Sequence, residues 1–133
     1  MNTSKDCLII EENFVISMDL EDIVKSMGFD FIDQATSLTQ ATELLEKMQY
    51  RMAFLDLYLG QESSLPIAKM LNKQNIPFAI ITAYYDEDSL PNSLKGIPII
   101  QKPYSTNTIN RVVFELLNSP PCHSRISEVP TSL

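Results

Sequence analysis

The stretch Met52-Ala53-Phe54-Leu55-Asp56 is an unbroken apolar run that ends in a carboxylate. Three other segments have the same form: Leu8-Ile9-Ile10 before Glu11-Glu12, Phe78-Ala79-Ile80-Ile81 before Thr82, and Ile97-Pro98-Ile99-Ile100-Gln101 before Lys102-Pro103. Short unbroken apolar runs are typical of strands buried on both faces of a parallel sheet. Because the carboxyl ends of parallel strands share one edge, three carboxylates, a hydroxyl and an amine are predicted to converge there.

Between these runs, apolar residues recur at the spacing of an α-helix, which predicts a parallel sheet covered on both faces. Four helices are expected from the stripes Ile16–Met27, Leu38–Met48, Ile67–Leu71 and Ile109–Leu117. Residues that commonly bound helices stand at their expected ends: Gly28, Ser37 with Gln40, Pro66, and Ser105 with Thr106. A second strand at Phe29–Ile32 completes an α/β fold with five strands and four helices.

The connection Ala83–Gly96 has a poor composition for a helix, with Pro91 in its middle and only Leu90 and Leu94 as an apolar pair. We expect a loop with one turn at most, and a mobile one. Beyond Asn118 the chain is polar and contains Ser-Pro-Pro, which predicts a disordered tail. The expected organisation is a folded domain at 1–118 and a tail at 119–133.

The 133 residues suffice for one domain with a sizeable core, and 44% of them are hydrophobic. The formal net charge of −7 disfavours non-specific binding to nucleic acid or an anionic membrane. No apolar run approaches the length of a membrane span. Cys7 and Cys122 are too few for a disulfide framework. These features predict a cytoplasmic protein.

The polar residues at the shared edge suit the transfer of a phosphoryl group to a carboxylate. Asp56 is the candidate nucleophile, and a cation is needed to screen the incoming charge. Mg²⁺ is the expected cofactor because it prefers hard oxygen ligands and keeps exchangeable waters. Asp56 and Glu12 are the candidate direct or water-mediated ligands, with Glu11 behind them and the backbone carbonyl of Tyr58 as a further ligand.

Three residues would complete the chemistry. Lys102 would pair with a phosphoryl oxygen as a point charge, and Thr82 would donate its hydroxyl to another oxygen. Ala83 is small enough to leave the group room to approach. Each of these residues also has an ordinary structural reading, since a lone Asp after a strand is most often a cap or loop residue. The combination of order and strand-end placement favours the functional interpretation.

These motifs resemble the receiver domain of a two-component response regulator, over about Cys7 to Asn118. The matching residues are Glu11-Glu12, Asp56 within Phe-Leu-Asp-Leu, Thr82-Ala83 and Lys102-Pro103. The resemblance implies a flavodoxin-like (βα)5 fold that receives a phosphoryl group from a histidine kinase or phosphotransfer protein. The segments Pro77–Tyr84, Leu90-Pro91 and Gly96–Pro98 further resemble single-domain receivers with a PFxFATGY motif. In those proteins the fourth helix is reduced or replaced by a flexible segment.

The sequence departs from the family pattern at two functional positions. Receivers more often carry Asp-Asp or Glu-Asp where this chain has Glu11-Glu12. Ile99 stands where many receivers place a switching Tyr or Phe. Signalling is therefore expected to use the 83–96 segment. The candidate aromatic residues for it are Tyr84, Tyr85 and Tyr104; the alternative is that these tyrosines only cover the sheet edge.

We expect a stand-alone response regulator, not an enzyme, that acts on an unknown downstream protein as a monomer or weak dimer. One alternative is a receiver-like binding module that does not need phosphate. Another is a phosphatase of the haloacid dehalogenase type, which also uses Asp, Thr, Lys and Mg²⁺. The second alternative is disfavoured because that family needs another Asp where this chain has Tyr58.

Overall fold

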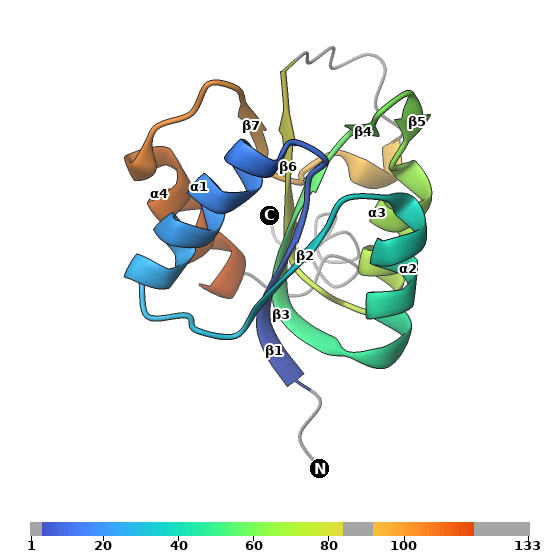
Figure 1. The fold of residues 1–133 in the computed structure, drawn as a ribbon, viewed down its shortest axis with the longest axis horizontal. Coiled ribbons are helices and arrows are strands. Elements are labelled where there is room, and N and C mark those ends of the chain that lie inside the picture. The colour runs from blue at the N-terminus through green and yellow to red at the C-terminus, as the bar shows by residue number, and fades with distance from the viewer. Residues whose placement is uncertain (1–3, 84–91, 119–133) are drawn as a thin grey trace, which may run out of the picture.

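The computed structural model describes residues 4–83 and 92–118, and within them the chain forms a sheet covered by helices (Figure 1). The strands are β1 (Ser4–Ile10), β2 (Ile32–Ala35), β3 (Gln49–Asp56), β4 (Tyr58–Leu59), β5 (Glu62–Ser63), β6 (Phe78–Thr82) and β7 (Ile99–Gln101). The helices are α1 (Phe14–Ser26), α2 (Leu38–Lys47), α3 (Leu65–Lys73), α4 (Thr106–Asn118) and the 3-10 helix η2 (Asn92–Leu94). Five strands pair in parallel in the order β2-β1-β3-β6-β7.

Helices cover both faces of this sheet, with α1 and α4 on one side and α2 and α3 on the other (Figure 1). Successive side chains of a strand point to opposite faces. Along β3, Met52 and Phe54 therefore pack towards α1 and α4, whereas Ala53 and Leu55 pack towards α2 and α3. All four are buried. This two-sided burial explains the unbroken apolar runs and confirms the predicted flavodoxin-like fold.

The helix boundaries expected from the sequence are confirmed at two caps. The Ser37 hydroxyl accepts a hydrogen bond from the Gln40 N–H at the start of α2. The Ser105 hydroxyl accepts one from the Thr108 N–H at the start of α4. In both cases a side chain satisfies a backbone donor that the first turn of a helix leaves unpaired.

The second strand does not lie at Phe29–Ile32 as predicted. It begins at Ile32 and runs through polar residues to Ala35. The Asp6 carboxylate instead accepts hydrogen bonds from the N–H groups of Asp30 and Phe31, in the connection that precedes the strand. Because β2 is an edge strand, it needs less apolar surface than the central strands. The apolar residues of Phe29–Ile32 were therefore a misleading signal for its position.

Two further elements differ from the prediction. A short antiparallel hairpin, β4–β5, follows β3 and was not expected. The last strand is confined to Ile99–Gln101, whereas Ile97 is buried against the α2/α3 side of the sheet. The expected single turn in the 83–96 connection is present as η2. Residues 84–91 of the proposed mobile segment, including Tyr84 and Tyr85, and the proposed tail at 119–133 lie outside the described residues.

Among the described residues, no helix combines the length and apolar character that crossing a membrane requires.

Candidate functional site

Four of the predicted site residues lie at the carboxyl ends of neighbouring strands. Asp56 is the last residue of β3 and Thr82 is the last of β6, while Glu11 follows β1 and Lys102 follows β7. The register pairs Asp56 with Ile81 and Thr82 with Gln101, so these strands end close to the same level. The parallel order therefore brings together residues that are far apart in the sequence, as predicted.

Lys102 joins the two carboxylates of this edge. Its Nζ lies 2.8 Å from Asp56 Oδ2 and 2.8 Å from Glu11 Oε1. Glu11 is 2% exposed and Asp56 is 9% exposed, so water screens these charges poorly. The backbone N–H of Lys102 donates to the Thr82 carbonyl at 2.9 Å, which attaches the lysine to the end of β6.

The burial of this cluster changes the pKa values of two of its members. Burial raises the pKa of Glu11, and the hydrogen bonds from Lys102 and the Asn13 N–H oppose this only in part. For Lys102, burial alone would lower the pKa, but hydrogen bonds to Asp56 and Glu11 outweigh it and the pKa is raised. The ammonium is therefore held in its charged form between the two carboxylates.

The second oxygen of each carboxylate is also held. Asp56 Oδ1 accepts a hydrogen bond from the Tyr58 N–H at 3.2 Å, and Glu11 Oε2 accepts one from the Asn13 N–H at 3.0 Å. Asn13 is at the same time the N-cap of α1, since its side chain accepts from the Ile16 N–H. The start of α1 therefore helps to orient Glu11.

Glu12 lies apart from this pair. Its side chain is exposed, and Oε1 accepts a hydrogen bond from the N–H of Gly60 in the β4–β5 hairpin. The described residues accordingly contain no group of three acidic, histidine or cysteine side chains close enough to hold a metal ion together. The carboxylates of Glu11 and Asp56 are the oxygen donors that Lys102 brings together, and hard oxygen donors of this kind fit Mg²⁺. The carbonyl of Tyr58 stays a predicted further ligand.

The remaining predicted residues differ in their surroundings. Thr82 is 2% exposed, whereas Ala83 is exposed and lines a pocket of about 600 Å³ together with Lys102. Ile99 is partly buried and packs towards α2 and α3. Tyr104 forms a hydrogen bond with Asp19 of α1. The pKa of Tyr104 is raised, mainly by burial and secondly by the negative charge of Asp19.

Sequence reasoning missed two groups that position the site. Ser64 is fully buried, and its hydroxyl donates a hydrogen bond to the backbone carbonyl of Asp56. Its N–H donates to the Leu57 carbonyl at 2.8 Å, which closes the base of the hairpin. Gly60 is the second, through its contact with Glu12. No sequence signal marks Ser64, but the Gly60-Gln61 pair between two short polar-apolar segments is compatible with a hairpin turn.

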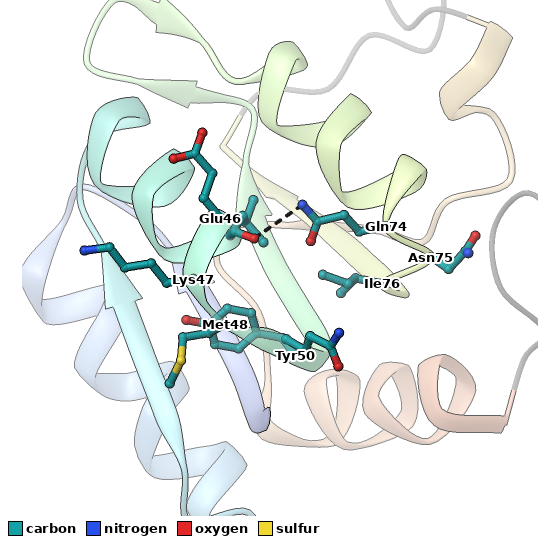
Figure 2. Close-up of a pocket in the computed structure, with 9 residues that line it drawn as sticks. Glu46, Lys47, Met48, Tyr50, Gln74, Asn75 and Ile76 are labelled. Carbon is teal, nitrogen blue, oxygen red and sulfur yellow. Dashed lines mark hydrogen bonds between the residues drawn. The ribbon is translucent and has the colours of Figure 1, made fainter. Parts of the chain in front are cut away.

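A second pocket, of about 530 Å³, lies at the opposite end of the sheet (Figure 2). It is lined by Leu45, Glu46, Lys47, Met48, Gln49, Tyr50, Gln74, Asn75 and Ile76. The Gln74 amide donates to the Leu45 carbonyl across it at 3.4 Å. Its only charged side chains, Glu46 and Lys47, are exposed, so this pocket lacks the buried convergent groups found at Asp56.

Comparison with known proteins identifies the family and the fold of the chain. Residues 7–114 match the family model of the response regulator receiver domain. The receiver domain of PhyR from Erythrobacter litoralis is 30% identical, with a TM-score of 0.74 over 88% of this chain and 95% of that chain. SdrG from Sphingomonas melonis Fr1 is 28% identical, with a TM-score of 0.73 over 88% of this chain and 99% of that chain.

Among curated proteins, the sensory transduction protein LytR from Staphylococcus haemolyticus is 28% identical over 84% of this chain and 46% of its own length. The chain thus spans about half the length of the curated relatives it matches. The family model covers most of the chain, the five-stranded sheet is that of the solved receivers, and the family is a signalling domain of two-component systems. The chain therefore belongs to the response regulator receiver domain family.

Proposed function

We propose that this chain accepts a phosphoryl group on the Asp56 carboxylate from a histidine kinase or histidine phosphotransfer protein, and that phosphorylation changes its contacts with a downstream protein. The observation that carries the proposal is the placement of Lys102 Nζ 2.8 Å from both Asp56 and Glu11 at the strand ends. A poorly solvated carboxylate beside a fixed cation can receive a negatively charged group without a large electrostatic penalty.

In the proposed step, an oxygen of Asp56 attacks phosphorus and forms an O–P bond. The P–N bond to the donor histidine breaks, and that nitrogen takes the electron pair and a proton. Lys102 would then turn from the carboxylate to a phosphoryl oxygen, to which its charge is attracted. Thr82 ends the adjacent strand β6 at the same edge of the sheet, and its hydroxyl would donate a hydrogen bond to another oxygen of the phosphoryl group.

Receiver domains generally use Mg²⁺ at the phosphorylation site. In this chain Glu11, Asp56, the Tyr58 carbonyl and Glu12 are the residues that would hold it. The cation, when bound, would neutralise charge on the transferred group. Two hydrogen bonds orient Asp56: the Tyr58 N–H donates to its side-chain Oδ1, and the Ser64 hydroxyl donates to its backbone carbonyl.

The surface around the site suits a protein donor. Phe14, Val15 and Met18 of α1 are exposed by 67%, 74% and 45%. Val15 lines the 600 Å³ pocket with Lys102, so this apolar surface adjoins the site. Apolar patches next to a reactive group are typical of docking surfaces. We place the donor there, and we propose a cytoplasmic regulator that acts as a monomer or weak dimer.

The proposal is tested by incubating the protein with acetyl phosphate and Mg²⁺ and measuring intact mass. One phosphoryl group is expected on the wild type and on Asp22→Asn, a variant of an exposed α1 carboxylate, and none on Asp56→Asn. Labelling of Asp56→Asn to the wild-type level would contradict the assignment. Many turnovers of p-nitrophenyl phosphate would instead support the phosphatase alternative.

A binding assay separates signalling by phosphorylation from a phosphate-independent module. A partner captured by the protein should bind more tightly or more weakly when beryllofluoride and Mg²⁺ are present. The same affinity with and without beryllofluoride, and for wild type and Asp56→Asn, would support the module.

A further inference from the structure

The contact between Glu12 and Gly60 connects the acidic pair after β1 to the hairpin after β3. Gly60 lies between β4 and β5 with φ +66, and its N–H donates to Glu12 Oε1. A Cβ added at this position would meet nothing within 4 Å. The glycine is therefore needed for its left-handed backbone conformation, which presents the N–H to Glu12, and not for close packing.

The hairpin is continuous with the candidate phosphoacceptor. Tyr58 opens β4 two residues after Asp56, and its N–H donates to Asp56 Oδ1. At the other end, Ser64 is attached to the Leu57 carbonyl and to the Asp56 carbonyl. The base of the hairpin is thus held by Asp56 and Ser64, whereas Glu12 holds its tip.

In this arrangement Glu12 is outside the carboxylate pair. Glu11 and Asp56 meet at Lys102, but the described residues contain no acidic group of three members. Glu12 must therefore move to join the other two around one cation, and a move away from the hairpin would break its hydrogen bond with Gly60. The length of the Glu12 side chain matters for this contact, because an aspartate at position 12 would be one methylene shorter and would reach less far towards the hairpin.

We propose that Glu12 is a tether with two competing partners, the Gly60 N–H and a divalent cation. Without a cation Glu12 holds the tip of the β4–β5 hairpin. With Mg²⁺ bound, Glu12 would turn towards Glu11 and Asp56 and leave Gly60, so the hairpin Tyr58–Ser63 would report whether the cation is present. The proposal rests on the Mg²⁺ site of the proposed function but not on phosphorylation of Asp56.

Competition of this kind is reciprocal. If Mg²⁺ weakens the tether, the tether must weaken Mg²⁺ binding by the same factor. A hydrogen bond from a backbone N–H to a carboxylate corresponds to a factor of roughly three to ten in affinity. Glu12→Asp keeps a carboxylate but shortens its reach, so it should bind Mg²⁺ about three to ten times more tightly than the wild type.

The experiment follows the Gly60 amide by ¹H–¹⁵N NMR during a titration with Mg²⁺ alone. In the wild type its proton resonance should move upfield on saturation and its hydrogen exchange should accelerate. Glu12→Asp without Mg²⁺ should already show the Gly60 position of the saturated wild type. Glu62→Gln, which removes a carboxylate from the same hairpin, should leave the Gly60 signal and Mg²⁺ affinity unchanged.

The outcomes separate the two proposals. If the amides of Asp56 and Lys102 respond to Mg²⁺ but Gly60 does not, the cation site stands and the tether is wrong. If none of them responds, the cation site is wrong and the tether proposal is overturned with it. A Gly60 response in protein that acetyl phosphate fails to phosphorylate would support the tether while contradicting the proposed function.

Discussion

Glu11 and Asp56 form ion pairs with the same ammonium group, that of Lys102, although they lie at the ends of different strands of the sheet. Lys102 Nζ lies 2.8 Å from Glu11 Oε1 and 2.8 Å from Asp56 Oδ2. The strands β1 and β3 are direct neighbours, so two like charges face each other where little water reaches them. The lysine therefore stabilises a charge arrangement that would otherwise be repulsive.

Replacing this lysine should destabilise the fold. Lys102→Met leaves the buried Glu11 carboxylate without its cation, and an unpaired buried charge of this kind costs about 1–3 kcal/mol. Urea unfolding at pH 7 should show a corresponding loss in the free energy of unfolding. The double variant Lys102→Met/Glu11→Gln should recover part of the loss. Equal stability of Lys102→Met and wild type would show that the ion pair contributes nothing.

Glu11 should make stability depend on pH in the mildly acidic range. Its pKa is raised in the fold by burial, above an unfolded value of about 4.3. Folding thus disfavours the charged form relative to the unfolded chain, so the contribution of Glu11 to stability is fully present below the unfolded pKa and is lost as pH rises through the folded pKa. Glu11→Gln stays neutral, and its stability relative to wild type should rise as the pH increases above about 4.

Urea unfolding of both proteins across this range measures the difference directly. Glu46→Gln, which changes an exposed carboxylate on α2, serves as the control and should show no such slope. A stability difference between Glu11→Gln and wild type that falls with pH would mean that Lys102 outweighs burial.

Tyr50 should contribute to stability through Asp33. Its hydroxyl donates to Asp33 Oδ2 at 2.5 Å, and Lys5 Nζ holds the other oxygen at 2.9 Å. Tyr50→Phe should lower the free energy of unfolding by about 1–2 kcal/mol at pH 7, because the hydrogen bond is to a charged group. Tyr58→Phe, at a side chain that is 53% exposed, should change little.

The same tyrosine gives a pH signature at the alkaline end. Burial and then Asp33 raise its pKa above the usual value of about 10. Its stabilisation is therefore complete below about pH 10 and is lost as the pH rises beyond that value. Wild type and Tyr50→Phe should converge in stability above pH 10, as followed by circular dichroism in urea.

The lifetime of the phosphoryl group should depend on two tyrosines that follow site residues in the sequence. Tyr58 is two residues after Asp56, and Tyr84, outside the described residues, is two after Thr82. If both hinder the approach of water, Tyr58→Asn with Tyr84→Ala should speed loss of phosphate. Decay of the phosphorylated protein, followed by intact mass after removal of acetyl phosphate, measures the rate. An unchanged half-life would show that Tyr58 and Tyr84 do not slow hydrolysis of the phosphoryl group.

Much of the fold follows from local pattern. The unbroken apolar runs at Met52–Leu55 and Phe78–Ile81 predict strands buried on both faces because each successive side chain faces one of two apolar layers. The caps at Ser37 and Ser105 are predicted because their hydroxyls serve backbone groups a few residues away. The β2 strand was misplaced because its Asp33 is held by Lys5 and Tyr50, and the residues before it by Asp6, contacts that are distant in the sequence.

For the site, order along the chain was enough to predict that Asp56, Thr82 and Lys102 share an edge, since parallel strands place their carboxyl ends together. Pattern could not assign the two glutamates. The sequence-based hypothesis put Glu12 beside Asp56 with Glu11 behind it, whereas in the fold Lys102 pairs Glu11 with Asp56 and Glu12 reaches Gly60. The periodicity of one segment encodes its own strand or helix, but distances between side chains depend on register and packing between segments, which arise only when the whole sheet is assembled.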